Sequence, residues 1–471
     1  MTGMGHREAR ERLAILLTLA GLTSFYLLTA SKMINWYDVH YFEEWFYVSM
    51  SYGIFSVYSL CEKVHYPPLA VLYYVSYRYL LHALHLDVKL WEFIFFLKIP
   101  IIASYLATLI LLLQRFEWPT VQWVALSIPA GMVIWGYQFD TMVALAMTLS
   151  AMVLLERRPA AAGTLLALAS SFKYVPATLA VPMSILLRVH RGKGHVVRFL
   201  TAFAGVIAAL WLPFFLSDPR AFMEQVFLFH MRRLPQDLTP FYVPILLSRW
   251  HVSRWSFLLG KLSGIVMAVG FAALFWWMWR RRGELVRTLI DRAGSRFALW
   301  GTCALLGAWF ALTTKVGNPY YLTWIFVWLF PFVGWCIPSW RFGLLNLLPF
   351  VYTFNMLPAP VLDREVFVPE DVRWYPALQL ILFPQRELEK AHWMRETSPH
   401  LFQVWYDHMH ITGAIVVISY VAVVAWVFAD LVRWARNPAE PRERPHDWPL
   451  HPLLVAFALP AFAFAVYLAF F

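Results

Sequence analysis

Long apolar segments without charge recur through this chain, and they constrain its fold more than any other feature. The first, Leu13 to Ala30, contains no charged residue. As a helix it is long enough to span a bilayer core of roughly 30 Å. Hydrophobic residues make up 60% of the chain and charged residues only 14%, which excludes an ordinary soluble globular protein. The sequence therefore predicts an all-α membrane protein that crosses the bilayer many times.

Basic residues at the ends of the apolar segments predict how the chain is oriented. Arg7, Arg10 and Arg12 precede the first segment, so the positive-inside rule keeps the N-terminus cytoplasmic. The basic clusters at 188–198 and 280–282 fall on that same side if 66–81 does not cross the bilayer. The pattern then predicts about thirteen membrane-spanning helices. They are expected at 13–30, 93–113, 121–135, 141–155, 160–170, 177–187, 199–216, 257–279, 297–312, 321–335, 342–356, 411–429 and 453–470.

Composition and motifs exclude several classes of function. The net charge of +11 is explained by basic residues at helix ends, so nucleic acid is not an expected partner. Cys61, Cys303 and Cys336 are scattered, which indicates neither a disulfide framework nor a zinc site. The chain has no glycine-rich phosphate loop and no motif with metal-ligand spacing. We therefore expect no nucleotide cofactor and no required metal.

We predict a single integral-membrane domain, 1–471, with two long extracytoplasmic loops. The loop 31–92 contains Asp38 and a stretch, Tyr41 to Tyr52, that suits a helix lying in the membrane interface. We predict that this loop is catalytic. The loop 357–410 is the longest, and we predict that it covers an acceptor site.

Polar and ionisable residues collect on the predicted outer face. Such residues near membrane depth are costly and usually have a functional reason to be there. Because they come from many separate loops, their coincidence on one face predicts a single site. The candidates that emerge there are Asp38, Tyr66, Asp140, Lys173, Arg232, Arg233, Lys315 and Asn318.

Each candidate also has a structural explanation. Asp38 could cap a helix or pair with Lys32, and Asp140 could be the N-cap of the span that follows it. Lys173 could reach the interface from an apolar hairpin without binding anything. Likewise, His40 and His65 could make interfacial hydrogen bonds, and Arg232 and Arg233 could belong to a solvated loop.

Six sequence elements, in order, resemble one known group of enzymes. They are Trp36-Tyr37-Asp38, Tyr66-Pro67-Pro68-Leu69, Gly136-Tyr137-Gln138-Phe139-Asp140, Phe172-Lys173-Tyr174-Val175-Pro176, His230-Met231-Arg232-Arg233 and the stretch from Lys315 to Trp324. The chain resembles the GT-C superfamily of integral-membrane glycosyltransferases, and within it the mannosyltransferase that adds the first mannose in GPI-anchor synthesis and related prokaryotic enzymes. It differs in lacking a paired-acid motif in the first loop, where His40 follows Asp38.

The resemblance implies a polyprenyl- or dolichyl-phosphate sugar as donor, with mannose as the expected sugar. Asp38 would be the general base on an acceptor hydroxyl of an extracytoplasmic lipid or glycan, and direct displacement would invert the anomeric centre. Lys173, Lys315 and Arg232 or Arg233 would hold the leaving phosphate without a metal. The other residues expected to bind substrate are Tyr37, His40, Tyr66, Gln138, Asp140, Tyr174, His230 and Asn318.

Two other functions remain open from sequence. A non-enzymatic flippase or transporter would place its binding groups near the bilayer midplane and often shows inverted repeats. Here the charges collect at one surface and no repeat is visible, which favours an enzyme. A polymerase or ligase of lipid-linked glycans would be a membrane enzyme of the same class and would differ mainly in its donor.

Overall fold

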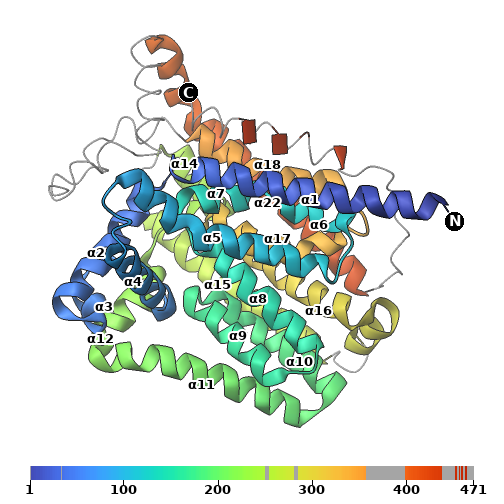
Figure 1. The fold of residues 1–471 in the computed structure, drawn as a ribbon. Coiled ribbons are helices and arrows are strands. Elements are labelled where there is room, and N and C mark those ends of the chain that lie inside the picture. Colours follow the sequence, from blue (N-terminus) through green and yellow to red (C-terminus); the bar gives the residue numbers. More distant parts are fainter. Residues whose placement is uncertain are drawn as a thin grey trace.

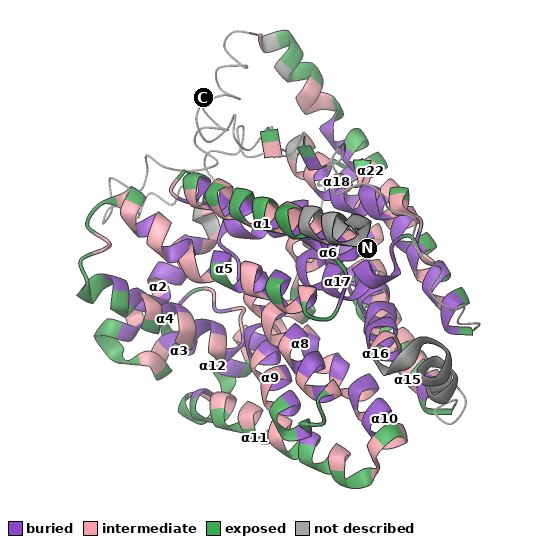
Figure 2. Ribbon diagram, turned by 45° about the vertical axis from the view of Figure 1, so that its right-hand side comes forward, coloured by how far each residue is buried: buried purple, intermediate pink, exposed green. Residues whose placement is uncertain are grey.

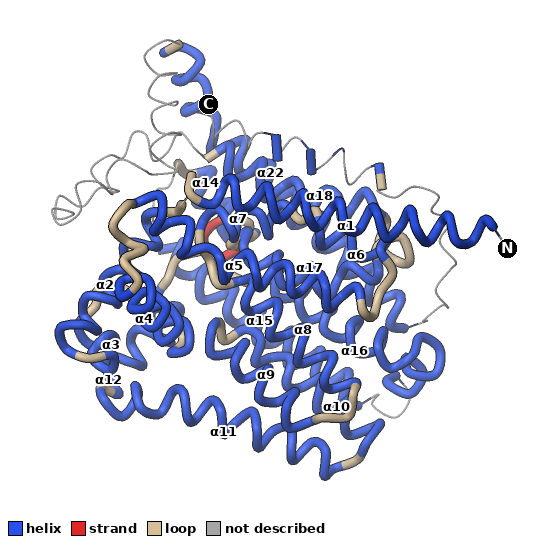
Figure 3. The backbone as a smooth tube through the Cα atoms, in the orientation of Figure 1, coloured by secondary structure: helices blue, strands red, loops and turns tan. Residues whose placement is uncertain are grey.

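The computed structural model describes residues 2–32, 34–249, 254–280, 285–356 and 398–436, and a few positions between 451 and 463. Helices form nearly all of the regular structure in these residues (Figure 3). The α-helices are α1 Thr2–Ala30, α2 Trp36–Tyr52, α3 Val57–Leu60, α4 Pro68–Ala83, α5 Leu90–Leu113, α6 Trp118–Ala125, α7 Ile128–Gly136, α8 Asp140–Leu155, α9 Pro159–Phe172, α10 Ala180–Arg191, α11 Lys193–Ser217, α12 Pro219–Met223, α13 Phe229–Arg232, α14 Val243–Leu247, α15 Arg254–Arg280, α16 Leu285–Thr313, α17 Leu322–Leu329, α18 Ser339–Asn355 and α22 Pro399–Arg436.

Short elements connect these helices. The 3₁₀ turns are η1 Ile54–Ser56, η2 Val175–Leu179, η4 Pro240–Tyr242, η5 Pro319–Tyr321 and η6 Phe330–Phe332, and η3 Glu224–Leu228 is a π-helical turn. The two strands are β1 Gln236–Asp237 and β2 Val316–Gly317.

Six helices within the described residues are long and apolar enough to cross a membrane. They are Glu11–Ala30, Leu90–Leu113, Lys193–Ser217, Arg254–Arg280, Arg296–Thr313 and Gln403–Arg436. The predicted multi-pass, all-α membrane protein is therefore confirmed. The count of about thirteen spans stays a prediction, because the other expected segments are shorter helices or lie outside the described residues.

The helices differ in how much of their surface the protein itself covers. The α16 span is 78% buried, whereas the α11 and α15 spans are only 11% and 17% buried. Figure 2 shows α11 as a largely exposed helix at the edge of the bundle. Because their surface residues are apolar, α11 and α15 suit contact with lipid.

Two predicted spans do not form single helices. The segment 121–135 divides into α6 and α7 at Ser127, and Asn346 in α18 binds both sides of the break: its Oδ1 accepts from Ile128 N at 2.8 Å, and its Nδ2 donates to Leu126 O at 3.1 Å. This buried amide satisfies backbone groups that a continuous helix would have paired itself. The segment 321–335 is only the short helix α17 followed by η6, where Pro331 cannot continue the α-helical hydrogen bonds.

The predicted first loop forms a layer of helices, α2 to α4, at one end of the bundle (Figure 1). A buried ion network fastens this layer together. Arg78 Nε in α4 lies 2.9 Å from Glu43 Oε1 in α2, and Arg78 Nη1 lies 2.7 Å from Asp87 Oδ2. Arg78 therefore interrupts the apolar run of α4 because it pairs with α2. Helix α4 is shorter than the six candidate spans, and its non-spanning role stays a prediction.

A two-residue parallel pairing joins segments that are far apart in sequence. Gln236 pairs with Val316 and Asp237 with Gly317. A Cβ atom on Gly317 would lie 2.2 Å from the carbonyl carbon of Leu238, so glycine is required for this close approach. The pairing holds the segment after α13 against the segment after α16.

Helix α22 begins earlier than predicted. The sequence places residues up to 410 in the long outer loop, but α22 already starts at Pro399. Its first turns are anchored to α18, because Asn355 Nδ2 donates to Met409 O at 2.7 Å and Trp405 Nε1 donates to Asn355 O at 3.2 Å. The predicted acceptor lid falls mainly in 357–397, which lies outside the described residues, as does most of the span predicted at 453–470.

Candidate active site

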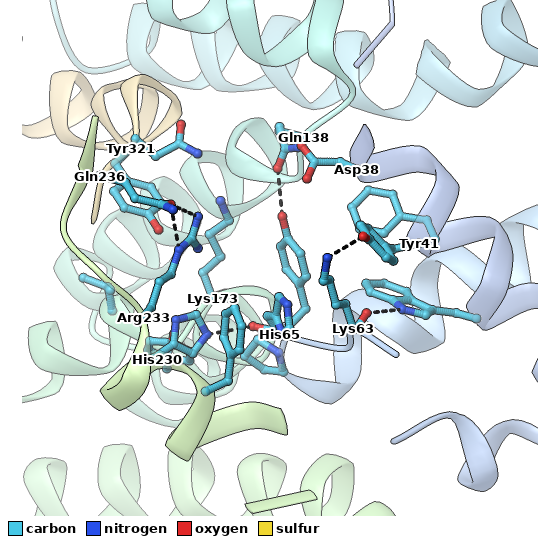
Figure 4. Close-up of a pocket in the computed structure, with 18 of the residues that line it drawn as sticks. Asp38, Tyr41, Lys63, His65, Gln138, Lys173, His230, Arg233, Gln236 and Tyr321 are labelled. Atoms are coloured by element: carbon cyan, nitrogen blue, oxygen red, sulfur yellow. Dashed lines mark hydrogen bonds between the residues drawn. The ribbon is translucent and has the colours of Figure 1, made fainter. Parts of the chain in front are cut away.

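A cavity of about 360 Å³ lies where the first-loop layer meets the ends of several core helices (Figure 4). This volume falls in the range of small-ligand sites, about 300–1,000 Å³. Aromatic rings dominate the walls, with a few charged groups among them. The lining residues are Asp38, Tyr41, Phe42, Trp45, Lys63, His65, Tyr66, Pro67, Gln138, Lys173, Tyr174, Val175, Phe229, His230, Arg233, Gln236, Asn318, Tyr321 and Trp324.

Asp38 lies in the first turn of α2 and lines the cavity. Its Oδ2 accepts hydrogen bonds from Asn35 Nδ2 at 2.7 Å and from Gln138 Nε2 at 2.6 Å. The N-cap of α2 is Asn35, which makes no side-chain cap, and no ion pair joins Asp38 to Lys32 in the described part of the chain. Both structural explanations for Asp38 are therefore wrong.

The surroundings of Asp38 tune its acidity. Burial raises the pKa of this carboxyl to about 6, although Lys173, Arg233 and the hydrogen bond from Gln138 all act to lower it. Desolvation disfavours the charged form of a carboxyl, while nearby cations favour it. A carboxylate with a pKa just below neutrality suits a general base, because it is ionised at neutral pH yet basic enough to accept a proton.

Gln138 reaches Asp38 from a sharp turn between α7 and α8. Tyr137 adopts a left-handed conformation, with φ of 55°, which ends α7. Gly136 lies close to Tyr320, since a Cβ atom there would be 2.8 Å from the Tyr320 hydroxyl. Tyr66 completes the arrangement, because its hydroxyl donates to Gln138 Oε1 at 2.9 Å.

Lys173 and Asp140 pair at the wall of the cavity. Lys173 Nζ lies 2.7 Å from Asp140 Oδ2, and Trp324 Nε1 donates to Asp140 Oδ1 at 3.1 Å. Asp140 makes no capping hydrogen bond in α8, so the capping explanation is wrong. Lys173 lies over the ring of Tyr321, at 4.9 Å from its centroid, so it does not simply extend towards water.

Arg233 and Arg232 have different positions. Arg233 lines the cavity, and its Nε and Nη2 donate to Gln236 Oε1 at 2.9 and 2.6 Å. No carboxylate of the described residues forms an ion pair with it. Arg232 instead pairs with Glu224 at 2.7 Å on the exposed surface and does not line the cavity. The structure therefore selects Arg233 as the candidate anion ligand.

Two histidines at the cavity wall are neutral. His230 Nε2 donates to the carbonyl oxygen of His65 at 3.0 Å, and the His65 ring stacks on Phe229 with centroids 3.3 Å apart. Burial, reinforced by nearby cations, lowers the pKa of His65 to about 3 and that of His230 to about 4. His230 therefore presents a neutral imidazole to the cavity, with Nδ1 as a hydrogen-bond acceptor.

The remaining predicted residues divide between the cavity and its support. Tyr174 and Asn318 line the cavity, and Asn318 Oδ1 also accepts from Tyr320 N at 3.0 Å. Lys315 does not line it; its Nζ donates to Met231 O at 2.9 Å. His40 is half-buried and does not line the cavity. The side chain of Tyr37 lies outside the described residues.

Several lining residues were not in the predicted set. Lys63 is the main omission: its Nζ donates to the Tyr41 hydroxyl and lies 4.4 Å from the centre of that ring, while Trp45 Nε1 donates to the Lys63 carbonyl at 2.9 Å. The signal was its place in the chain, three residues before Tyr66 in the same outer loop. Gln236 was also omitted, although it follows Arg233 closely.

No group of three or more His, Cys, Asp or Glu side chains is placed to hold a metal ion within the described residues. The expectation that no metal is required is not tested by this geometry and stays a prediction.

Comparisons with known proteins place this chain in a family. No curated protein sequence matches the chain. Among solved structures, the chain is similar to the crystal structure of ArnT from Cupriavidus metallidurans bound to undecaprenyl phosphate, with 13% identity, a TM-score of 0.42, and coverage of 96% of this chain and 87% of that one. The family model of glycosyltransferase family 87 matches residues 64–306, slightly more than half of the chain. The chain therefore belongs to glycosyltransferase family 87.

Proposed function

We propose that this glycosyltransferase moves a sugar, mannose, from a polyprenyl phosphate carrier to a hydroxyl of an extracytoplasmic lipid or glycan, with inversion at the anomeric carbon. One observation carries the proposal: a carboxylate, Asp38, and a guanidinium, Arg233, line the same aromatic cavity (Figure 4). A transfer of this kind needs a base at the acceptor and a positive charge at the leaving phosphate, and these two residues supply them.

The reaction is a single displacement. Asp38 takes the proton of the acceptor hydroxyl as the acceptor oxygen attacks the anomeric carbon. The bond from that carbon to the phosphate oxygen breaks, and the phosphate leaves with the electron pair. Arg233 binds the charge that develops on this oxygen, and the ammonium of Lys173 contributes from the neighbouring wall. General-base catalysis of this kind is worth roughly 10²–10⁴ in rate.

The lining of the cavity suits a sugar between these two groups. Trp45, Tyr66, Tyr174 and Trp324 present aromatic surface, which packs against the apolar face of a sugar ring. Asn318 and His230 add polar groups that can bind its hydroxyls. The superfamily resemblance of the six ordered motifs supports mannose as the sugar and a polyprenyl phosphate as the carrier.

Purified protein in liposomes tests the proposal. It would be incubated with polyprenyl-phosphate mannose that carries a radiolabel in the sugar, together with a membrane lipid extract, and the labelled product would be identified. Parallel reactions would contain polyprenyl-phosphate glucose or a nucleotide sugar. We expect transfer from the mannose lipid alone, and no loss of rate when EDTA is added. Transfer from the nucleotide sugar only, or movement of intact lipid across the bilayer without transfer, would contradict the proposal.

We further propose that the cavity opens on the extracytoplasmic side and that the N-terminus is cytoplasmic. Helix α11 offers a direct test, because Lys193 is its first residue, Arg220 follows its other end, and both are exposed. In a background without Cys61, Cys303 and Cys336, Arg220→Cys should react with an impermeant maleimide added outside, and Lys193→Cys should react only after the membrane is opened. The reverse pattern would overturn the orientation.

A further inference from the structure

The two carboxylate oxygens of Asp38 have different surroundings. Oδ2 accepts two hydrogen bonds, from Asn35 Nδ2 at 2.7 Å and Gln138 Nε2 at 2.6 Å. None of the described residues donates a hydrogen bond to Oδ1. Asp38 also lines the cavity. One oxygen is therefore anchored, and the other is available to a ligand.

The orientation of the Gln138 amide decides whether this anchor exists. Its Oε1 accepts from the Tyr66 hydroxyl at 2.9 Å, which leaves Nε2 directed at Asp38. The opposite orientation would bring Oε1 against the carboxylate and would leave the Tyr66 hydroxyl without its acceptor. Burial and the charges of Asp38 and Asp140 raise the pKa of Tyr66 well above its usual value, so the phenol keeps its proton and donates.

The backbone that carries Gln138 is also fixed. Gln138 N donates to Val133 O at 3.0 Å across the left-handed turn at Tyr137. Lys98, fully buried in α5, donates from Nζ to Trp135 O at 2.9 Å, at the C-terminal end of α7. Carbonyl groups in the last turn of a helix have no partner within the helix, and this bond satisfies one of them. The amide therefore reaches Asp38 from a rigid support.

We propose that Gln138 and Tyr66 are positioning residues that act through Asp38, and that Oδ1 of Asp38 is the atom that accepts the acceptor's proton. This inference deepens the proposed function and rests on it. In the transfer step the proton passes from the acceptor hydroxyl to Oδ1 while Oδ2 keeps both of its hydrogen bonds. Gln138 thus has a role distinct from the substrate binding predicted for it from sequence.

The first test replaces Gln138 with leucine. Loss of a hydrogen bond to the charged form raises the pKa of a carboxyl, and for a bond to an ionised group the shift is roughly one to two pH units. In Gln138→Leu we expect the Asp38 titration to move upward by that amount. The acid limb of kcat/KM should move equally, with little change in donor affinity. The titration is followed by infrared difference spectroscopy, with Asp38→Asn identifying the carboxyl band. Gln122→Leu is the matched control, since Gln122 is buried in α6 and donates to Pro119 O.

The second test uses Tyr66→Phe, which keeps the ring and removes only the hydroxyl. If Tyr66 acts through Gln138, this variant should raise the Asp38 pKa by less than Gln138→Leu does. In the Gln138→Leu background it should add nothing. Tyr77→Phe is the control, because the Tyr77 hydroxyl donates to Phe96 O, away from the cavity. Additive shifts, or an Asp38 titration unchanged in both single variants, would overturn the inference.

The infrared titration needs no substrate, so the two proposals can fail separately. An upward shift of the Asp38 band without any transfer from polyprenyl-phosphate mannose would contradict the proposed donor and leave the positioning roles supported. Transfer from that donor with an unshifted band would contradict the positioning roles alone.

Discussion

Lys173 and Asp140 form an ion pair in which Nζ lies 2.7 Å from Oδ2. The two members have unequal surroundings: the Asp140 side chain is fully buried, whereas the Lys173 side chain is 12% exposed. Lys173 therefore brings to the cavity a charge that Asp140 already balances in part. Arg233, whose partner is the neutral amide of Gln236, is the stronger attraction for an anion.

This pairing predicts that Lys173→Met destabilises the protein. Removal of one partner leaves a buried charge without compensation, which costs about 3–5 kcal/mol. The double variant Lys173→Met/Asp140→Asn should recover most of the lost stability, because the amide that replaces the carboxylate is neutral and can still accept from Trp324. Thermal unfolding in detergent measures both. Lys315→Met serves as control, since Lys315 donates only to a backbone carbonyl in the described structure. A Lys173→Met protein with wild-type stability would show that the pair is not formed.

Asp38→Asn should reduce transfer by roughly two to four orders of magnitude, because an amide cannot accept the acceptor's proton. Donor affinity should change little, since the shape of the side chain is kept. The measurement is single-turnover transfer alongside donor binding. Asp218→Asn is the control: Asp218 caps α12 by accepting from Ala221 N, and asparagine caps about as well. Near-normal turnover by Asp38→Asn would exclude Asp38 as the base.

The pH dependence of transfer should report the same carboxyl. Burial raises the pKa of Asp38 to about 6, so the base is protonated and inactive below that pH and ionised above it. We expect kcat/KM to rise with pH, with a midpoint near 6, and to level off towards neutrality. Steady-state rates across this range check the midpoint. If kcat/KM stayed constant down to the ordinary pKa of an aspartate carboxyl, Asp38 would not be desolvated as described.

Arg233 and Arg232 give a matched pair of substitutions. Arg233→Gln removes a cation from the cavity wall, and loss of hydrogen bonds to a charged ligand costs about 1.5–3 kcal/mol, which corresponds to roughly a 10- to 150-fold weaker donor affinity. Arg232→Gln removes only an exposed pair with Glu224, which is worth about 0–1 kcal/mol. Donor binding by both variants separates the two. Equal losses would indicate that both arginines contact the donor.

Much of the fold follows from patterns that short stretches of sequence contain. Uncharged runs such as Leu13 to Ala30 fix membrane helices, because their backbone groups must be paired within the segment. The break between α6 and α7 does not follow, because the groups it frees are satisfied by Asn346, more than two hundred residues away. The short helix α17 does have a local signal, because it ends at Leu329 and Pro331 follows.

The sequence predicted several residues of the site but not how they pair. Topology places Asp38, Gln138, Lys173 and Arg233 on one face, and all four line the cavity. Which of two adjacent arginines faces inward depends on the end of α13 and on the pairing of β1 with β2, and neither has a local signal. The sequence assigned Asp140 to substrate, yet it is buried against Lys173, a contact between distant residues.

The pairing of β1 with β2 has a consequence for how a donor phosphate would be bound. Gln236 N donates to Lys315 O at 2.8 Å, and Lys315 Nζ donates to Met231 O at 2.9 Å. Hydrogen bonds therefore join the β1 and β2 segments on both sides of Arg233. Arg233 and the Asn318–Tyr321 turn therefore belong to one hydrogen-bonded unit. The opposite wall carries Asp38, Tyr41 and Lys63. Hydrogen bonds from Gln138 to Asp38 and from His230 to the His65 carbonyl join that wall to the rest of the site. The phosphate of a donor would therefore meet a guanidinium whose position is already set by backbone pairing before the donor binds.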